Sequence, residues 1–255
     1  MTDNWRIWNK AKDYGDLLYK RAIGDLDEME SSKALCRILS SFYEKRMKVL
    51  DVGCGAGHYL RSIRLRIDED IDYTGVDATE YYVNLARTAF DDAACFLRGD
   101  IYNLPFEDNS FDIVICNNLI LHLPPPPIKP VSELVRTSSK YIVVRTVFAE
   151  RNYIIKEVRS SYGEKQGLPI RDGNLIDSKG EPLVYNYFNM YTEKYFRDIV
   201  ADINEKIDVK IVPDDSWSSF DNTALAGKTA TKVISGKQVS GNLLLDWRFL
   251  VLSQK

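Results

Sequence analysis

The sequence feature that most constrains this fold is the stretch Lys48–Gly57, KVLDVGCGAG. Its apolar start predicts a short buried strand, and the glycines that follow, Gly53, Gly55 and Gly57, predict a tight turn. Glycine tolerates a positive φ and lets a ligand lie directly against the backbone. Apolar residues then recur at helical spacing, so the chain passes from strand to glycine turn to helix. The free N–H groups at the start of such a helix favour a ligand with a carboxylate or a phosphate.

The spacing of the glycines narrows the choice of ligand. A dinucleotide fingerprint, G-x-G-x-x-G, needs its third glycine where this chain has His58. The phosphate loop G-x-x-x-x-G-K-[ST] is also missing from the stretch. These differences disfavour an NAD-dependent oxidoreductase on a Rossmann fold, which stays open as an alternative.

Two motifs resemble those of class I S-adenosylmethionine (SAM)-dependent methyltransferases. The pattern V-L-D-V-G-C-G-A-G resembles their first motif. The run L-P-F-E-D-N-S-F-D-I-V at Leu104–Val114 resembles the stretch before the fourth strand in the small-molecule branch of the family. The resemblance covers residues 47–147 and implies SAM as the cofactor. It also implies a single α/β domain over residues 1–255, built on a Rossmann-like, seven-stranded, mostly parallel sheet with helices on both faces and an antiparallel last strand.

Apolar runs place the remaining elements of that fold. After the first strand, further strands are predicted at Asp72–Asp77, Ala94–Arg98, Phe111–Cys116, Tyr141–Val147, Val209–Val212 and Leu243–Leu252. Helices are predicted at Asp25–Phe42, Thr79–Phe90 and Thr192–Val200, the last with Thr192 as its N-cap. Residues 213–239 have no clear pattern and stay unassigned.

The resemblance also assigns residues to the cofactor. Asp77 ends the second strand, where a carboxylate can accept hydrogen bonds from both hydroxyls of a ribose. Asp100 and Ile101 match the pair that binds adenine in the family, through a side-chain acceptor and a backbone N–H. Asp51 is placed near the amino group of the cofactor, and His58 near its methionine part. The full predicted set is Asp51, Gly53, Cys54, Gly55, Gly57, His58, Asp77, Ala78, Asp100, Ile101 and Asn117.

Methyl transfer from SAM requires few catalytic groups. The methyl group is already activated, so the protein mainly aligns the acceptor with it and excludes water. A hydroxyl acceptor also needs a base. The candidate catalytic residues are His122, at the rim of the fourth strand, and Tyr14 and Tyr19, from the N-terminal segment. The alternative for His122 is a packed loop histidine without a catalytic role.

The acceptor is constrained by a motif that is missing. Enzymes that methylate amino groups on adenine or glutamine carry [DNS]-P-P-[YF] at the end of the fourth strand, where residues 117–120 are NNLI. We therefore expect a small-molecule or carbohydrate acceptor that is methylated on oxygen without a metal, with nitrogen and carbon left open. A non-catalytic SAM-binding or interaction protein is a second alternative, because a cofactor site does not establish turnover.

The flanks of the motif region are expected to cover the site. Residues 1–45 are predicted to form an N-terminal helical flap. Residues 148–190 are too long for a simple connection and are predicted to form a lid insertion after the fifth strand. Its aromatic residues would line the acceptor side, and these are Tyr185, Tyr187, Phe188 and Tyr191.

Composition excludes several other classes. A net charge of −3 without a long basic run argues against a nucleic-acid partner. No apolar run reaches the roughly 18 residues that span a bilayer, and the start lacks a signal-peptide core, so we expect a cytoplasmic protein. The two histidines and four scattered cysteines predict reduced thiols and no metal site. The sequence does not specify an oligomeric state.

Overall fold

The computed structural model describes residues 7–159, 161, 174–217, 232–240 and 243–254. The first six residues of the predicted flap therefore lie outside the described residues, as do residues 160 and 162–173 of the predicted lid. Residues 218–231 of the stretch left unassigned above also lie outside them.

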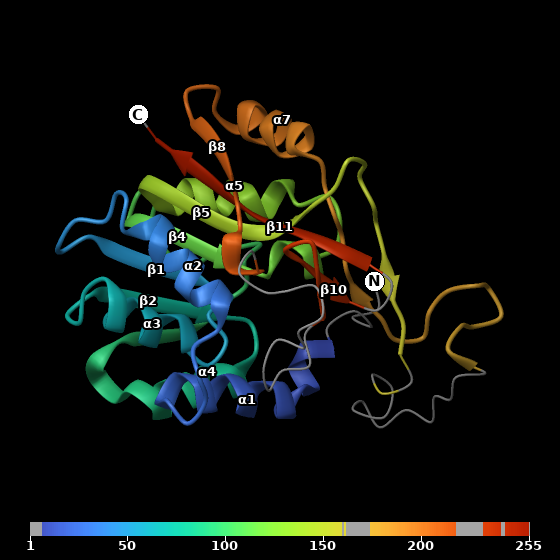
Figure 1. The fold of residues 1–255 in the computed structure, drawn as a ribbon, viewed down its shortest axis with the longest axis horizontal. Coiled ribbons are helices and arrows are strands. Elements are labelled where there is room, and N and C mark those ends of the chain that lie inside the picture. The colour runs from blue at the N-terminus through green and yellow to red at the C-terminus, as the bar shows by residue number, and fades with distance from the viewer. Residues whose placement is uncertain (1–6, 160, 162–173, 218–231, 241–242, 255) are drawn as a thin grey trace.

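A mixed sheet forms the centre of the molecule (Figure 1). Its order begins β3-β2-β1-β4-β5-β11, and β8 pairs with β11. Neighbouring strands from β3 to β5 are parallel, whereas β11 runs antiparallel to both β5 and β8. The seven predicted strands and the antiparallel last strand are thereby confirmed. Their bounds are β1 (Lys48–Val52), β2 (Asp72–Asp77), β3 (Cys95–Arg98), β4 (Phe111–Asn117), β5 (Ser138–Phe148), β8 (Asp208–Pro213) and β11 (Leu243–Ser253).

In the described part of the chain, two further strands join the seven predicted ones, so the sheet has nine. The additional strands, β9 (Lys232–Ile234) and β10 (Lys237–Ser240), form an antiparallel hairpin that extends the start of β11. Ser235 and Gly236 join them with φ values of 50° and 72°, which is the geometry of a tight hairpin turn. These strands are short and largely polar, so they lack the apolar run that identifies the others.

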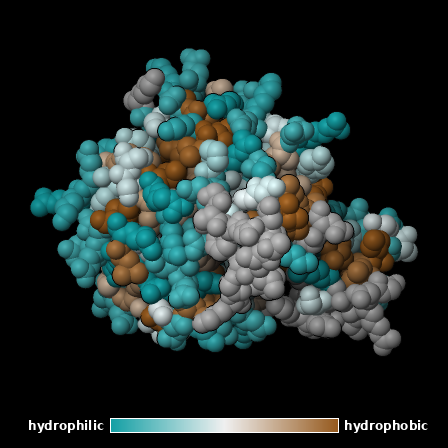
Figure 2. Space-filling model, in the orientation of Figure 1, coloured by the Kyte–Doolittle hydropathy of each residue, from teal (hydrophilic) through white to brown (hydrophobic). Residues whose placement is uncertain are grey.

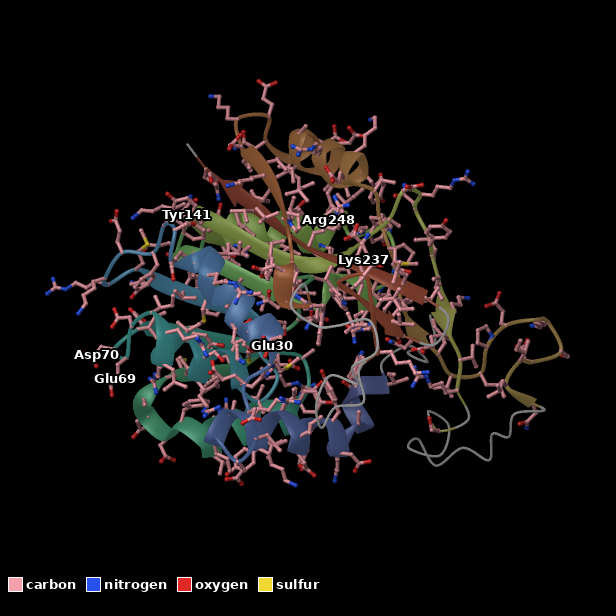
Figure 3. All side chains as sticks on the ribbon, in the orientation of Figure 1. Glu30, Glu69, Asp70, Tyr141, Lys237 and Arg248 are labelled. Carbon is pink, nitrogen blue, oxygen red and sulfur yellow. The ribbon has the colours of Figure 1, made fainter. Side chains whose placement is uncertain are left out.

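The hairpin is tied to β11 by charged side chains. The carboxylate of Asp246 lies 3.4 Å from the ammonium of Lys237 and 2.6 Å from the guanidinium of Arg248. Lys237 and Arg248 come from neighbouring strands and lie close together in Figure 3.

Helices cover both faces of the sheet (Figure 1), as predicted. Buried residues of α2, α3 and α4 share one core cluster with Val49 and Ile113, and those of α5 and α7 share another with Leu50 and Val114. Hydrophilic side chains cover most of the face seen in Figure 2. The helix bounds are α1 (Lys12–Ile23), α2 (Glu30–Leu39), α3 (His58–Arg66), α4 (Glu80–Phe90), α5 (Ile128–Thr137) and α7 (Glu193–Ile203).

Two helix ends show how local sequence sets these bounds. The hydroxyl of Thr192 accepts a hydrogen bond from the backbone N–H of Tyr195 at 3.1 Å, which confirms the predicted N-cap of α7. The helix predicted at Asp25–Phe42 is shorter than expected, because Met29 is extended, with a φ of −70° and a ψ of 143°, and α2 begins only after it.

The segment after β5 lies beyond the end of the sheet where β5 finishes (Figure 1, yellow to light orange). Within it, β6 (Lys156–Glu157) and β7 (Asn186–Tyr187) pair as a separate two-stranded sheet. Short 3₁₀ helices complete the described chain, namely η1 (Ile7–Lys10), η2 (Asp91–Ala93), η3 (Ile120–His122) and η5 (Asp215–Trp217).

Candidate functional site

A cavity of about 170 Å³ lies at the carboxyl ends of β1, β2 and β4, beneath α1. Ligands of open parallel α/β sheets bind at this edge, where the order of the strands reverses. Most of the predicted site residues line it together: Tyr14, Gly53, Gly55, His58, Asp77, Ala78, Asp100, Ile101, Asn117 and His122.

Four predicted site residues do not line the cavity. The carboxylate of Asp51 accepts a hydrogen bond from the hydroxyl of Tyr73 at 2.6 Å, and burial raises the pKa of Asp51 to about 7. Cys54 is fully buried beneath the turn. A Cβ on Gly57 would lie 2.8 Å from the ring of Phe90, which puts this glycine against the core. Tyr19 is half-buried on α1 but does not reach the cavity.

The glycine turn forms one wall of the cavity with bare backbone. Gly53 and Gly55 have φ values of 82° and 56°, in the left-handed region that side chains rarely adopt. A Cβ on Gly53 would lie 2.9 Å from Leu119, and one on Gly55 would lie 2.8 Å from Leu18. Leu119 and Leu18 also line the cavity, so a side chain at either glycine would press on the lining of the cavity.

Asp77 holds its carboxylate at the cavity wall by backbone hydrogen bonds. One oxygen accepts from the N–H of Gly55 at 3.0 Å, and the other accepts from the N–H of Thr79 at 2.8 Å. Burial raises the pKa of this carboxyl above its usual value. A carboxylate oxygen can accept more than one hydrogen bond, so Asp77 can still receive hydroxyl groups of a ligand.

Two buried polar side chains at the cavity have no partner among the described residues. Both amide atoms of Asn117 are unpaired although the residue is only 6% exposed, and Nδ1 of His58 is unpaired as well. Burial lowers the pKa of His58 to about 3, so this imidazole is neutral. An unpaired buried polar group costs about 1–3 kcal/mol. A ligand with polar groups at these positions would remove that cost.

The N-terminal segment closes the other side of the cavity. Trp8 packs on the rings of His122 and Tyr14, with centroids 5.1 and 5.4 Å apart. The start of α1 is fixed on α4, because the hydroxyl of Tyr82 donates to the carbonyl of Ala11 at 2.9 Å. The cavity is therefore enclosed by α1 and by the aromatic side chains before it.

His122 occupies the wall between the N-terminal segment and the segment after β5, which is the predicted lid. Its Nδ1 lies 2.8 Å from the carbonyl oxygen of Tyr187 and 3.0 Å from the side-chain amide of Asn186. Burial lowers the pKa of this imidazole, so it is neutral at neutral pH.

The sequence and the fold of this chain are similar to those of known methyltransferases. Residues 49–139 match the family model described as a methyltransferase domain. The chain is 39% identical over 83 residues to a sterol 24-C-methyltransferase of Gibberella zeae. The aligned region covers 31% of this chain and 21% of that protein. It is 38% identical over 72 residues to the demethylmenaquinone methyltransferase of Staphylococcus aureus, which covers 28% of this chain and 30% of that protein. Magnesium protoporphyrin IX methyltransferase from Synechocystis, solved with bound SAM, has the same fold, with a TM-score of 0.57. The two sequences are 14% identical, and the match covers 100% of this chain and 99% of that one.

Residues 49–139 therefore form a methyltransferase domain, and the chain has the fold of solved SAM-dependent methyltransferases. The assignment replaces the NAD-dependent oxidoreductase that the glycine turn left open. The chain spans only 21% and 30% of the length of the two curated relatives above. None of the described helices is long and apolar enough to cross a membrane.

The structure also contains a buried ion pair that sequence reasoning missed. Arg145, which is 3% exposed, donates from Nε to a carboxylate oxygen of Asp214 at 2.6 Å. Another of its nitrogens donates to the amide oxygen of Asn118, a cavity residue, at 2.5 Å. The guanidinium lies 4.1 Å from the ring centroid of Trp247. Only the placement of Arg145 near the end of a central strand offered a signal in the sequence.

Further lining residues were missed because their neighbours are distant in the chain. Tyr59 is an example: its hydroxyl donates to Ser31 at 3.1 Å and lies 3.4 Å from the amide nitrogen of Asn118. The lining residues outside the predicted site set are Trp8, Asn9, Leu18, Val52, Tyr59, Val76, Thr79, Tyr82, Gly99, Tyr102, Asn118, Leu119 and Leu123.

Proposed function

We propose that this protein uses SAM to methylate a hydroxyl group of an uncharged small molecule. The observation that carries the proposal is one cavity that brings together a glycine turn, the carboxylate of Asp77, the unpaired amide of Asn117 and the neutral imidazole of His122. SAM supplies a methyl group on a positively charged sulfur, which is activated for in-line displacement.

The residues at the glycine turn fit the cofactor. Gly53 and Gly55 leave room for it against the backbone, and the carboxylate of Asp77 would accept from the ribose hydroxyls. The unpaired groups of Asn117 and His58 would pair with its polar parts. Asp100, Ile101 and Ala78 would hold the adenine and ribose, whereas Asp51, Cys54 and Gly57 would support the turn from behind.

The acceptor side of the cavity is aromatic and apolar. It is formed by Trp8, Tyr14, Leu119, His122 and Leu123. Among the described lining residues, none is a lysine or an arginine. An acceptor with a phosphate or sulfate would find no cation there, whereas an uncharged ring would pack on the aromatic side chains. Two relatives are named for sterol and demethylmenaquinone methylation, which agrees with acceptors of this kind.

His122 is the proposed base. A neutral imidazole at the cavity wall can take the proton of an acceptor hydroxyl. Bound SAM would supply the methyl group, and its sulfur would leave with the electron pair of the carbon–sulfur bond as the hydroxyl oxygen bonds to the methyl carbon. The imidazole of His122 would take the proton of that hydroxyl. The phenol of Tyr14, which lines the cavity, is protonated at neutral pH and would orient the acceptor as a hydrogen-bond donor. Tyr19 has no proposed role, because it does not reach the cavity.

Calorimetric titration with S-adenosylhomocysteine (SAH), run beside NAD, tests the cofactor. We expect micromolar binding of SAH and no binding of NAD. Absence of SAH binding would overturn the proposal. Binding of SAH followed by failure to methylate any member of a panel of uncharged phenols, sterols and sugars would favour the non-catalytic SAM-binding protein.

A further inference from the structure

The lid holds the loop that carries His122 by its backbone. Asn189, which is fully buried, donates from its backbone N–H to the carbonyl of Leu121 and from its side-chain amide to the carbonyl of Leu123, both at 2.8 Å. These bonds bracket His122 on both sides. The position of the imidazole is therefore set by the lid as well as by β4.

The same lid segment also determines which imidazole nitrogen carries the proton. The carbonyl oxygen of Tyr187 can only accept, so its 2.8 Å approach to Nδ1 of His122 requires a proton on that nitrogen. The amide of Asn186 lies 3.0 Å from Nδ1, and a half-turn of the amide points its oxygen, which otherwise has no partner among the described residues, at the same N–H. In the neutral ring, Nε2 is then left with the lone pair.

The surroundings of His122 keep the ring neutral. The rings of Trp8 and Phe188 pack on it with centroids 5.1 and 5.8 Å away. Burial lowers its pKa, and this outweighs the opposite effects of Tyr187, Asn186 and the carboxylate of Glu157 on β6. Glu157 is itself paired with Arg159.

We infer that Asn186 and Asn189 are positioning residues of the lid, which hold His122 in the tautomer with the proton on Nδ1 so that Nε2 accepts the proton of the acceptor hydroxyl. The inference rests on the proposed function for the role of Nε2. Its structural part, the tautomer and its dependence on the lid, is independent of methyl transfer. The tautomer of the imidazole therefore depends on contacts that the lid residues make with the loop of His122.

Nitrogen-15 NMR of the full chain labelled at histidine tests the tautomer directly. The chain has only His58 and His122, so the spectrum is simple, and His122→Gln assigns its signals. We expect His122 to be neutral at pH 7 with its proton on Nδ1. Asn189→Leu should convert it to a mixture of both tautomers and leave the His58 signals unchanged.

Asn152→Leu is the matched control, because Asn152 belongs to the same lid segment but accepts from the N–H of Thr192, away from His122. It should leave the tautomer of His122 unchanged. A proton on Nε2 in the unmodified protein would overturn the inference. If the tautomer of His122 were the same in Asn189→Leu as in the unmodified protein, the inference would be overturned as well.

Asn186→Asp tests the contact with the side chain. A carboxylate facing Nδ1–H would stabilise the imidazolium and raise the NMR titration midpoint of His122 by about one pH unit or more. Asn152→Asp should leave this midpoint where it is. An unchanged midpoint in Asn186→Asp would show that residue 186 does not face the imidazole, and would overturn its role.

SAH binding separates this inference from the proposed function. The correct tautomer without SAH binding would overturn the proposed function alone. SAH binding with the wrong tautomer would overturn the role of the lid alone.

Discussion

At the scale of single residues, the carboxylate of Asp77 gives the sharpest test of where the cofactor binds. We predict that Asp77→Ala weakens SAH binding by tenfold or more, about 1.4 kcal/mol, because two hydrogen bonds to ribose hydroxyls would be lost. Calorimetric titration measures this. Asp70→Ala is the control, because Asp70 is exposed and remote from the cavity (Figure 3). Unchanged affinity in a folded Asp77→Ala variant would contradict the placement of the ribose.

A second residue, Asp51, makes the stability of the folded protein depend on pH. Burial raises its pKa from 3.8 to about 7, so between these values the folded protein binds more protons than the unfolded chain. Stability should therefore fall as the pH rises through this window. We predict that Asp51→Asn removes this loss, on the order of 2 kcal/mol between pH 5 and 7.5, and keeps an acceptor for the hydroxyl of Tyr73. Urea unfolding at the two pH values measures it, and an equal loss in both proteins would contradict the assignment.

At the scale of elements, α1 lines the cavity over the glycine turn. Leu18 is buried and lines the cavity above Gly55, whereas its neighbour Leu17 is 39% exposed and does not line it. We predict that Leu18→Ala weakens SAH binding several-fold, because the turn would be opened to water. Leu17→Ala on the same helix should leave the affinity unchanged. Calorimetry compares the two variants, and equal affinities would show that α1 does not cover the bound cofactor.

The elements also show what sequence can and cannot predict here. Strands with apolar runs, such as β4 and β5, were found because a buried parallel strand must be apolar on both faces. Asp77 and the glycines were placed because the turn, the strand end and the ligand-facing backbone are local in sequence. The hydrogen bonds of His122 could not be predicted, because its partners in the lid lie 64 and 65 positions further along the chain. The hairpin of β9 and β10 was missed because these strands lack an apolar run: β10 pairs with β11, and β9 pairs only with β10.

At the scale of the whole molecule, the buried pair of Arg145 and Asp214 joins parts of the chain that are far apart in sequence. The arginine is on β5, and the carboxylate follows β8, 69 positions later. The guanidinium also stacks on Trp247 of β11 and bonds to Asn118 at the cavity. The pair thus connects the antiparallel part of the sheet to the wall of the cavity.

Removing one partner of this pair should therefore affect both stability and binding. We predict that Asp214→Ala lowers the free energy of unfolding by roughly 3–5 kcal/mol, because it leaves the charge of Arg145 buried without a partner. SAH binding should also weaken, since Asn118 would lose its fixed position. Asp198→Ala is the matched control, because its ion pair with Lys194 is exposed and should contribute less than about 1 kcal/mol.

Replacing both charges at once, with Arg145→Met and Asp214→Leu, should restore much of the stability but not the SAH affinity, because Asn118 stays without its donor. Denaturant unfolding and calorimetry separate the two effects, and a loss in Asp214→Ala no larger than in Asp198→Ala would show that the buried pair does not hold the two parts together.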